Sequence, residues 1–316
     1  MSTPVVLLSL AFLIAAVCAA IMGYAVQRGA TCLVAAVDEV LTKRRADRIL
    51  GLIEAAVWVT GGVLTWRVLG GHETLPIGYP ATLATIAGGL LLGIGAYVTR
   101  ACVFGAVARF GSGEWAYALT PVGFYLGCAV AWPLIGKFPA MHVASPLFDA
   151  RWLLVPFAVF VVMRGVEALR AARSGAFAAH IWTPHRATAV IGIVFAISLI
   201  AIGPWAYTYA LLTLAQGKTD GVVVKFVLLF MLFAGALVGG WTAGRLKLRT
   251  PTPAAVARCL GGGMLMGAGS LLIPGGNDEL LLVGIPLLQP YAGLAVVSMA
   301  VAIAIGQTAE RRLSAL

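Results

Sequence analysis

Nine long apolar runs dominate the chain and constrain its fold more than any other feature. They cover residues 5–26, 49–70, 79–99, 115–136, 152–169, 188–208, 222–244, 259–273 and 287–307. Several reach the roughly 20 residues that an α-helix needs to cross the hydrocarbon core of a bilayer. The runs are continuous and do not alternate with polar residues, which favours helices over a β-barrel. The sequence therefore predicts an all-α integral membrane protein with about nine transmembrane helices.

The composition agrees with this class. Only 11% of the 316 residues are charged and 61% are hydrophobic, whereas a soluble domain carries about 25% charged residues. The first apolar run has no basic residue before it. It is also longer than the apolar core of a typical signal peptide. We therefore expect it to be a membrane span.

The basic residues predict an orientation. If the N-terminus lies outside and the chain crosses nine times, 17 of the 22 Lys and Arg residues fall on the inner side. Positive charge is enriched in this way on the cytoplasmic side of membrane proteins. We therefore expect a multi-pass protein of the cell inner membrane with a cytoplasmic C-terminus. Anionic membrane lipid then accounts for the net charge of +10, and no nucleic acid partner is expected.

Two glycine-rich segments indicate an internal duplication. Residues 88–102 read GGLLLGIGAYVTRAC and residues 262–276 read GGMLMGAGSLLIPGG, and the two share four glycines and a leucine in register. In the nine-span topology they lie on the third and eighth spans, which run in opposite directions. The single transmembrane domain, 1–316, is therefore expected to contain two inverted-topology repeats, 1–150 and 171–316, joined by a helix over 151–170. Inverted repeats place a substrate path at their interface.

Four segments are too short or too rich in glycine to cross a membrane. The first follows Cys32 and the second, 103–114, follows Cys102. The other two are 205–215 and 277–284. We predict short re-entrant or interfacial helices here. Irregular backbone at membrane depth is tolerated only where protein or a water-filled cavity satisfies it, so these breaks are expected to surround a path. Most other glycines, including those of the GxxxG steps, are expected to let helices approach closely.

Three of the five cysteines look structural. Cys18, Cys128 and Cys259 lie in smooth apolar runs, where cysteine acts as a small buried hydrophobe. The sequence contains no CxxC pair and no Cys/His cluster of zinc-site spacing, so neither a metal nor a cofactor is expected. The four histidines are all predicted to lie in loops.

Cys32 and Cys102 are different, because each follows an arginine and begins a short helix. A helix N-terminus and a nearby guanidinium both favour an anion and a thiolate. One such site is as compatible with structure as with function, but two in one transporter-like chain favour function. Arg28 and Arg100 are either substrate contacts or residues that extend to lipid headgroups. Gln27 is a weaker candidate for a substrate contact.

The break before 277 offers a third candidate site. In a functional interpretation, Gly276 leaves backbone N–H groups open to a ligand and Asn277 lines the path. In a structural interpretation, Asn277 caps the helix that follows. Asp278 and Glu279 are then first-turn acids that the helix dipole stabilises.

Two further acidic residues are candidates for a functional or structural role, and several motifs of enzymes and pumps are absent from the sequence. Glu54, inside the second span, either pairs with an arginine at the inner border or is a functional group. Glu114 is expected to be a helix cap or a partner of Arg109. The sequence has no GxxxxGK[ST], HExxH or GxSxG motif, so an ATP-driven pump and a soluble-type hydrolase are not expected. We do not expect an enzyme.

Three motifs carry a family resemblance. GYAVQRGATC (23–32), GGLLLGIGAYVTRACVFGAVARFGSGE (88–114) and ARCLGGGMLMGAGSLLIPGGND (257–278) resemble the YeeE/YedE sulfur-transport family, whose TsuA-type members transport thiosulfate. The resemblance implies uptake of thiosulfate or a related sulfur or selenium species along functional cysteines, which hand the ion on through S–H···S contacts. Cys32 and Cys102 match the first two of these cysteines. The third position is Gly276 here.

The residue pattern and the family resemblance together predict a transport function. We expect a transporter or channel for uptake of a small inorganic sulfur anion, such as thiosulfate, with contacts at Cys32 and Cys102. With one thiol fewer, the chain passes either a different ion or the same ion by another contact. An alternative is a sulfur-relay protein that carries a persulfide on Cys102 or Cys32 for a cytoplasmic sulfur-acceptor protein. A third interpretation is a structural or partner-binding membrane subunit.

Overall fold

The computed structural model describes residues 9–71, 76, 78–135, 143–175, 177–273 and 275–314. Its longer helices are α2 (Leu10–Gly29), α4 (Asp47–Val68), α5 (Leu83–Thr99), α7 (Leu119–Ile135), α8 (Leu154–Arg173), α10 (Pro184–Ile202), α12 (Val222–Thr242), α13 (Pro253–Leu272) and α15 (Pro290–Ser314). Its short helices are α3 (Leu33–Lys43), α6 (Val103–Gly111), α9 (Phe177–Ile181), α11 (Tyr207–Ala215) and α14 (Asn277–Glu279). The 3₁₀ turns are η1 (Trp115–Ala118), η2 (Pro146–Asp149) and η3 (Arg151–Leu153), and the π-helical η4 covers Leu280–Gly284.

The prediction of nine spans is confirmed. Within the described ranges, nine helical segments are long and apolar enough to cross a membrane. Two of them combine a long helix with the short one that follows, α2 with α3 and α5 with α6. The sixth apolar run, 188–208, divides between two helices. Helix α10 stops at Ile202 because Gly203 adopts a φ of +83° and Pro204 follows, and the predicted short helix over 205–215 is α11.

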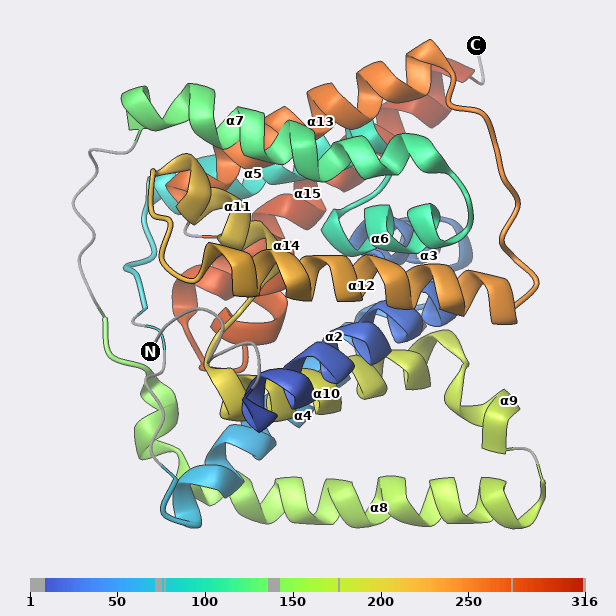
Figure 1. The fold of residues 1–316 in the computed structure, drawn as a ribbon, viewed down its shortest axis with the longest axis vertical. Coiled ribbons are helices and arrows are strands. Elements are labelled where there is room, and N and C mark those ends of the chain that lie inside the picture. Colours follow the sequence, from blue (N-terminus) through green and yellow to red (C-terminus); the bar gives the residue numbers. More distant parts are fainter. Residues whose placement is uncertain are drawn as a thin grey trace.

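The packing of the long helices repeats itself across the two copies (Figure 1). Helix α2 packs on α12 as α10 packs on α4, and α5 packs on α15 as α13 packs on α7. Two further pairs, α2 with α10 and α5 with α13, join equivalent helices of the two copies. This is the pattern that a two-fold relation between the copies requires.

The copies run in opposite directions, as the charge pattern predicted. Gly88 in α5 lies against Gly269 in α13, and Gly95 lies against Gly262. The equivalent helices α5 and α13 are therefore antiparallel. Corresponding helices that are antiparallel define an inverted-topology repeat.

Glycine permits the close approach of these helices. A Cβ atom at Gly93 would lie 2.5 Å from the carbonyl oxygen of Met299 on α15, and one at Gly263 would lie 2.6 Å from that of Thr120. Any side chain here would push the backbones apart, so the packing interpretation of the GxxxG steps is confirmed. The three cysteines expected to be structural, Cys18, Cys128 and Cys259, are all buried.

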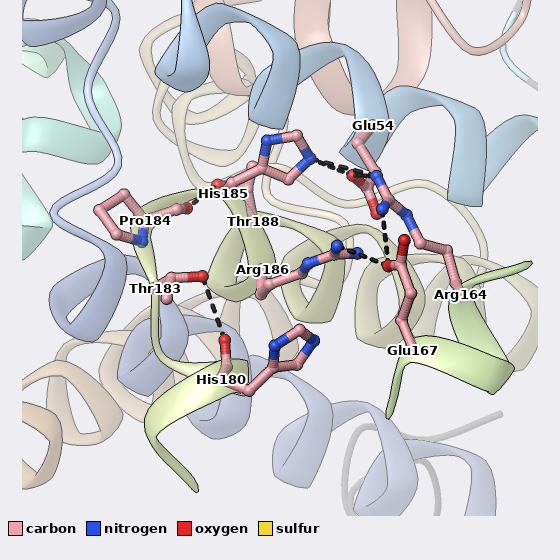
Figure 2. A network of polar contacts seen from close by, with 9 residues as sticks. All are labelled: Glu54, Arg164, Glu167, His180, Thr183, Pro184, His185, Arg186 and Thr188. Carbon is pink, nitrogen blue, oxygen red and sulfur yellow. Dashed lines mark hydrogen bonds and ion pairs between the residues drawn. The ribbon is translucent and has the colours of Figure 1, made fainter. Parts of the chain in front are cut away.

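Helix α8, which lies between the two copies in the chain, is held by ion pairs and by the packing of Phe157 and Phe160 against Trp58 of α4. It buries none of its residues. Arg164 of α8 pairs with Glu54 of α4 at 2.5 Å and with Glu167 at 2.9 Å, and Arg186 of α10 pairs with Glu167 at 2.5 Å. His185 of α10 also contacts the Glu54 carboxylate (Figure 2). Glu54 therefore has the arginine partner that one of the two sequence interpretations expected.

The structure corrects the prediction that the histidines lie in loops. His180 belongs to α9, and His185 lies in the first turn of α10, where it joins the Glu54 network. Their helices are short or begin with proline, which hid them from the apolar pattern. His72 and His142 lie outside the described residues.

Candidate functional site

Four short helices begin near the middle of the protein, and their first residues form the candidate site. The N-cap residues are Cys32 for α3, Cys102 for α6, Ala206 for α11 and Gly276 for α14. Cys32 and Ala206 are as far apart in sequence as Cys102 and Gly276, so the four caps are two pairs of equivalent positions. In Figure 1, α3 and α6 lie to one side of the centre and α11 and α14 to the other. Of these four N-cap positions, the two in the first copy carry thiols and the two in the second copy do not.

The two thiols lie together at the starts of α3 and α6. The backbone N–H of Leu33 donates to Cys102 Sγ at 3.2 Å, and the Cys32 side chain interacts with the Cys102 thiol. Gly105 makes room for this arrangement, since a Cβ atom there would lie 2.5 Å from Cys32 Sγ. Cys102 is fully buried, whereas Cys32 is partly exposed. The pair thus joins a buried thiol to an accessible one.

Asn277 connects the second copy to the Cys102 helix. Its Oδ1 accepts a hydrogen bond from the Val103 backbone N–H at 3.1 Å. The Tyr207 hydroxyl donates to the Val103 carbonyl oxygen at 3.1 Å. Asn277 therefore caps α6 of the other copy, and the prediction that it caps its own helix was wrong. Its Nδ2 is buried and has no hydrogen-bond partner among the described residues.

Thr208 closes the turn at Gly276. The Gly276 N–H donates to Thr208 Oγ1 at 3.0 Å, and that hydroxyl donates to the Asp278 carboxylate. The Thr208 N–H also donates to Asp278 at 3.3 Å. The Gly276 N–H is thus not open to a ligand, contrary to the functional interpretation of this glycine. Asp278 sits at the N-terminus of α11, where its charge is favourable.

A cavity opens beside Cys32. Its volume is about 600 Å³, and it is lined by the C-terminal ends of α5 and α15, by α3 and α6, and by the start of α4. Four arginines line it, against two acids: Arg48, Arg100, Arg109 and Arg311, with Asp38 and Glu310. The excess of positive charge suits an anion. The cavity lies at the arginine-rich face that the sequence assigned to the cytoplasm.

The other predicted contacts do not gather at the thiols. Arg100 lines the cavity, but it is exposed and pairs with Glu310 at 3.0 Å. Arg28 lies over the rings of Tyr24 and Trp182.

The amide of Gln27 is buried between α2, α6 and α12. Its Nε2 donates to Ser112 Oγ at 3.3 Å. Proximity in sequence to a cysteine therefore did not predict proximity to its sulfur, because the chain turns sharply between the two. The Arg109–Glu114 pair, at 3.3 Å, was predicted and is present.

Sequence reasoning missed Thr208 and Tyr207 as site residues. The signal was available in the internal repeat. The position equivalent to Cys32 in the second copy, separated from it by the same number of residues as Gly276 is from Cys102, is Ala206, which directly precedes these two residues.

The comparison with protein families agrees with these observations. The chain matches the family described as sulphur transport over residues 28–305, which includes all four short helices. The chain belongs to the sulphur-transport family. No curated protein matches it. Membership, together with the nine apolar helices, makes this a multi-pass membrane protein of sulfur transport, and it points to a transporter rather than an enzyme.

Proposed function

We propose that the chain takes up thiosulfate, or a closely similar sulfur anion, along the line from α14 through Cys102 to Cys32. The observation that carries this proposal is the contact between a buried and an accessible thiol at the start of two facing helices. A thiol is a weak, polarisable donor that suits a soft sulfur atom. Two helix N-termini add positive electrostatic potential at the same place.

Asn277 supplies the contact that a third thiol makes in the family. Its Nδ2 is a fully buried donor with no partner in the part of the chain that the structure describes, and its Oδ1 is fixed by the Val103 N–H. An amide N–H donates to the oxygen atoms of an oxyanion, whereas the thiols face its terminal sulfur. This arrangement favours the same ion by another contact over a different ion. Gly276 serves as the turn that places Asn277.

The arginine-lined cavity beside Cys32 serves as the exit. In this proposal the N-terminus lies outside the cell and the C-terminus in the cytoplasm, so the cavity opens to the cytoplasm. An excess of positive charge draws an anion out of the buried thiol pair. Arg100 acts here on the electrostatic potential of the cavity and does not contact the thiols.

Uptake into liposomes containing the purified protein tests the proposal. Thiosulfate, sulfite, sulfate and selenite are compared for the parent chain, for Cys102→Ala and for Cys128→Ala, whose cysteine is equally buried but distant. We expect Cys102→Ala to lower thiosulfate uptake by roughly tenfold or more and Cys128→Ala to leave it within about twofold. Equal uptake by the parent and Cys102→Ala would contradict the site, and no thiosulfate uptake by the parent would contradict the function.

The sulfur-relay alternative keeps one observation in its favour. Cys32 lines the open cavity, where a cytoplasmic acceptor protein can reach it. In that case Cys32 or Cys102 carries an additional sulfur atom as a persulfide, which mass spectrometry detects and which reduction removes. Uptake by the purified protein without any persulfide favours transport.

A further inference from the structure

Glu279 is a buried carboxyl group without an assigned task. Its side chain is only 7% exposed, and its Oε2 has no hydrogen-bond partner within the part of the chain that the structure describes. The neighbouring Asp278 differs, because Thr208 satisfies both of its oxygens. Removing a carboxylate from water without such partners disfavours its ionised form.

The Glu279 carboxyl lies at the candidate path. A Cβ atom at Gly275 would be 2.5 Å from its Oε2, so the side chain folds back over the turn that precedes Gly276. Gly275 has a φ of +101°, a conformation that suits glycine and leaves this space free. The carboxyl is therefore next to the segment that places Asn277 against the Cys102 helix.

Glu279 also lies on the side opposite the arginine-lined cavity. The cavity is formed by the C-terminal ends of α5 and α15. The titratable groups facing Glu279 come from the segment before α5, from the start of α15, and from α11, α12 and α14: Tyr79, Tyr291, Tyr209, Lys225 and Asp278. In the proposed orientation this is the outer side.

These neighbours surround Glu279 without satisfying both of its oxygens. The rings of Tyr79 and Tyr291 pack edge to face with centroids 5.5 Å apart. Lys225 Nζ donates to Thr213 Oγ1 at 3.2 Å and lies 5.7 Å from the Tyr209 ring centroid. Tyr79, Tyr209 and Lys225 are partly exposed, so in the proposed orientation this group of side chains is open towards the outer side.

We infer that Glu279 must carry a proton for the anion to pass, so that the pH of the outer solution sets the rate of uptake. An ionised Glu279 would repel a divalent anion at the outer end of the path, and a protonated one does not. The proton comes from outer water and returns to it, and no other bond changes. This inference rests on the proposed function, since it assigns Glu279 to the admission of the same anion.

Replacing Glu279 by its neutral isostere gives a sharp test. Thiosulfate uptake into liposomes is measured with the inner pH and the membrane potential clamped, while the outer pH is varied between about 5 and 9. We expect uptake by the parent to fall about fivefold or more as the outer pH rises and Glu279 loses its proton. Uptake by Glu279→Gln should stay nearly constant and exceed that of the parent at the alkaline end.

Asp220→Asn is the matched control, because Asp220 is an exposed acid near the same Lys225. It should keep the pH dependence of the parent, and so should Glu279→Asp, which retains a titratable group. If folded Glu279→Gln keeps that dependence, or transports at no pH, the inference is wrong. Should the glutamine variant fail to fold, a pH-independent Glu279→Asp refutes the inference and a pH-dependent one supports it. Uptake by the parent that ignores outer pH contradicts only this inference, whereas no uptake at any pH contradicts the proposed function.

Discussion

Removing the Thr208 hydroxyl should destabilise the turn at Gly276 by a predictable amount. In Thr208→Val the shape of the side chain is kept, but the buried Gly276 N–H loses its acceptor and Asp278 loses a donor. An unsatisfied buried donor costs about 1–3 kcal/mol, and a hydrogen bond to a charged group contributes about 1.5–3 kcal/mol. We therefore expect the free energy of unfolding to fall by about 2.5–6 kcal/mol.

A double-mutant cycle tests how much of this loss in the free energy of unfolding comes from the hydrogen bond between Thr208 and Asp278. Equilibrium unfolding in detergent micelles is measured for Thr208→Val, Asp278→Asn and the double variant. With a neutral amide at position 278 in place of the carboxylate, the loss of the Thr208 hydroxyl should cost about 1–1.5 kcal/mol less, since the hydrogen bond is then between neutral groups. Thr188→Val is the control, because its buried hydroxyl only donates to Pro184 in its own helix. If Thr208→Val lowers the free energy of unfolding equally with Asp278 and with Asn at that position, the hydrogen bond between Thr208 of α11 and Asp278 of α14 does not contribute as proposed.

Two further substitutions probe the thiol positions. Gly105→Ala places a Cβ atom 2.5 Å from Cys32 Sγ, well inside the roughly 3.5–4.0 Å of a normal contact. It should lower thiosulfate uptake strongly and the free energy of unfolding by about 1–3 kcal/mol, and unchanged uptake would contradict the thiol contact. Gly276→Cys places a Cβ atom 2.7–2.9 Å from the Thr208 side chain, so we expect it to raise uptake only when combined with Thr208→Ser. A folded double variant with no gain over Thr208→Ser alone would show that a third thiol does not assist the ion.

Some features were predictable from sequence because they depend on local composition. The apolar runs predicted the spans, and the glycine segments predicted both the helix contacts and, with the basic residues, the opposed copies. The breaks after Cys32 and Cys102 were predictable because few apolar residues separate each cysteine from a polar or basic run. Each of these signals can be read from residue types and their positions in the chain, without knowledge of which side chains meet.

The polar contacts of the site were not predictable, because each joins distant segments. Asn277 looked like a cap for its own helix, yet its partner is Val103. Gly276 looked open to a ligand, yet Thr208 takes its N–H. Arg28 precedes Cys32 closely in sequence but turns towards Trp182. Only tertiary packing decides between such partners.

The cross-copy packing of the long helices limits how the protein can move. Each long helix of the first copy lies along a helix of the second, and several of these contacts are between backbones at glycine. Neither copy is a separate rigid body that could rock against the other, as in many transporters built from inverted repeats. We therefore expect motion during a transport cycle to be confined to the short helices and their side chains, within a framework of long helices that keeps its packing.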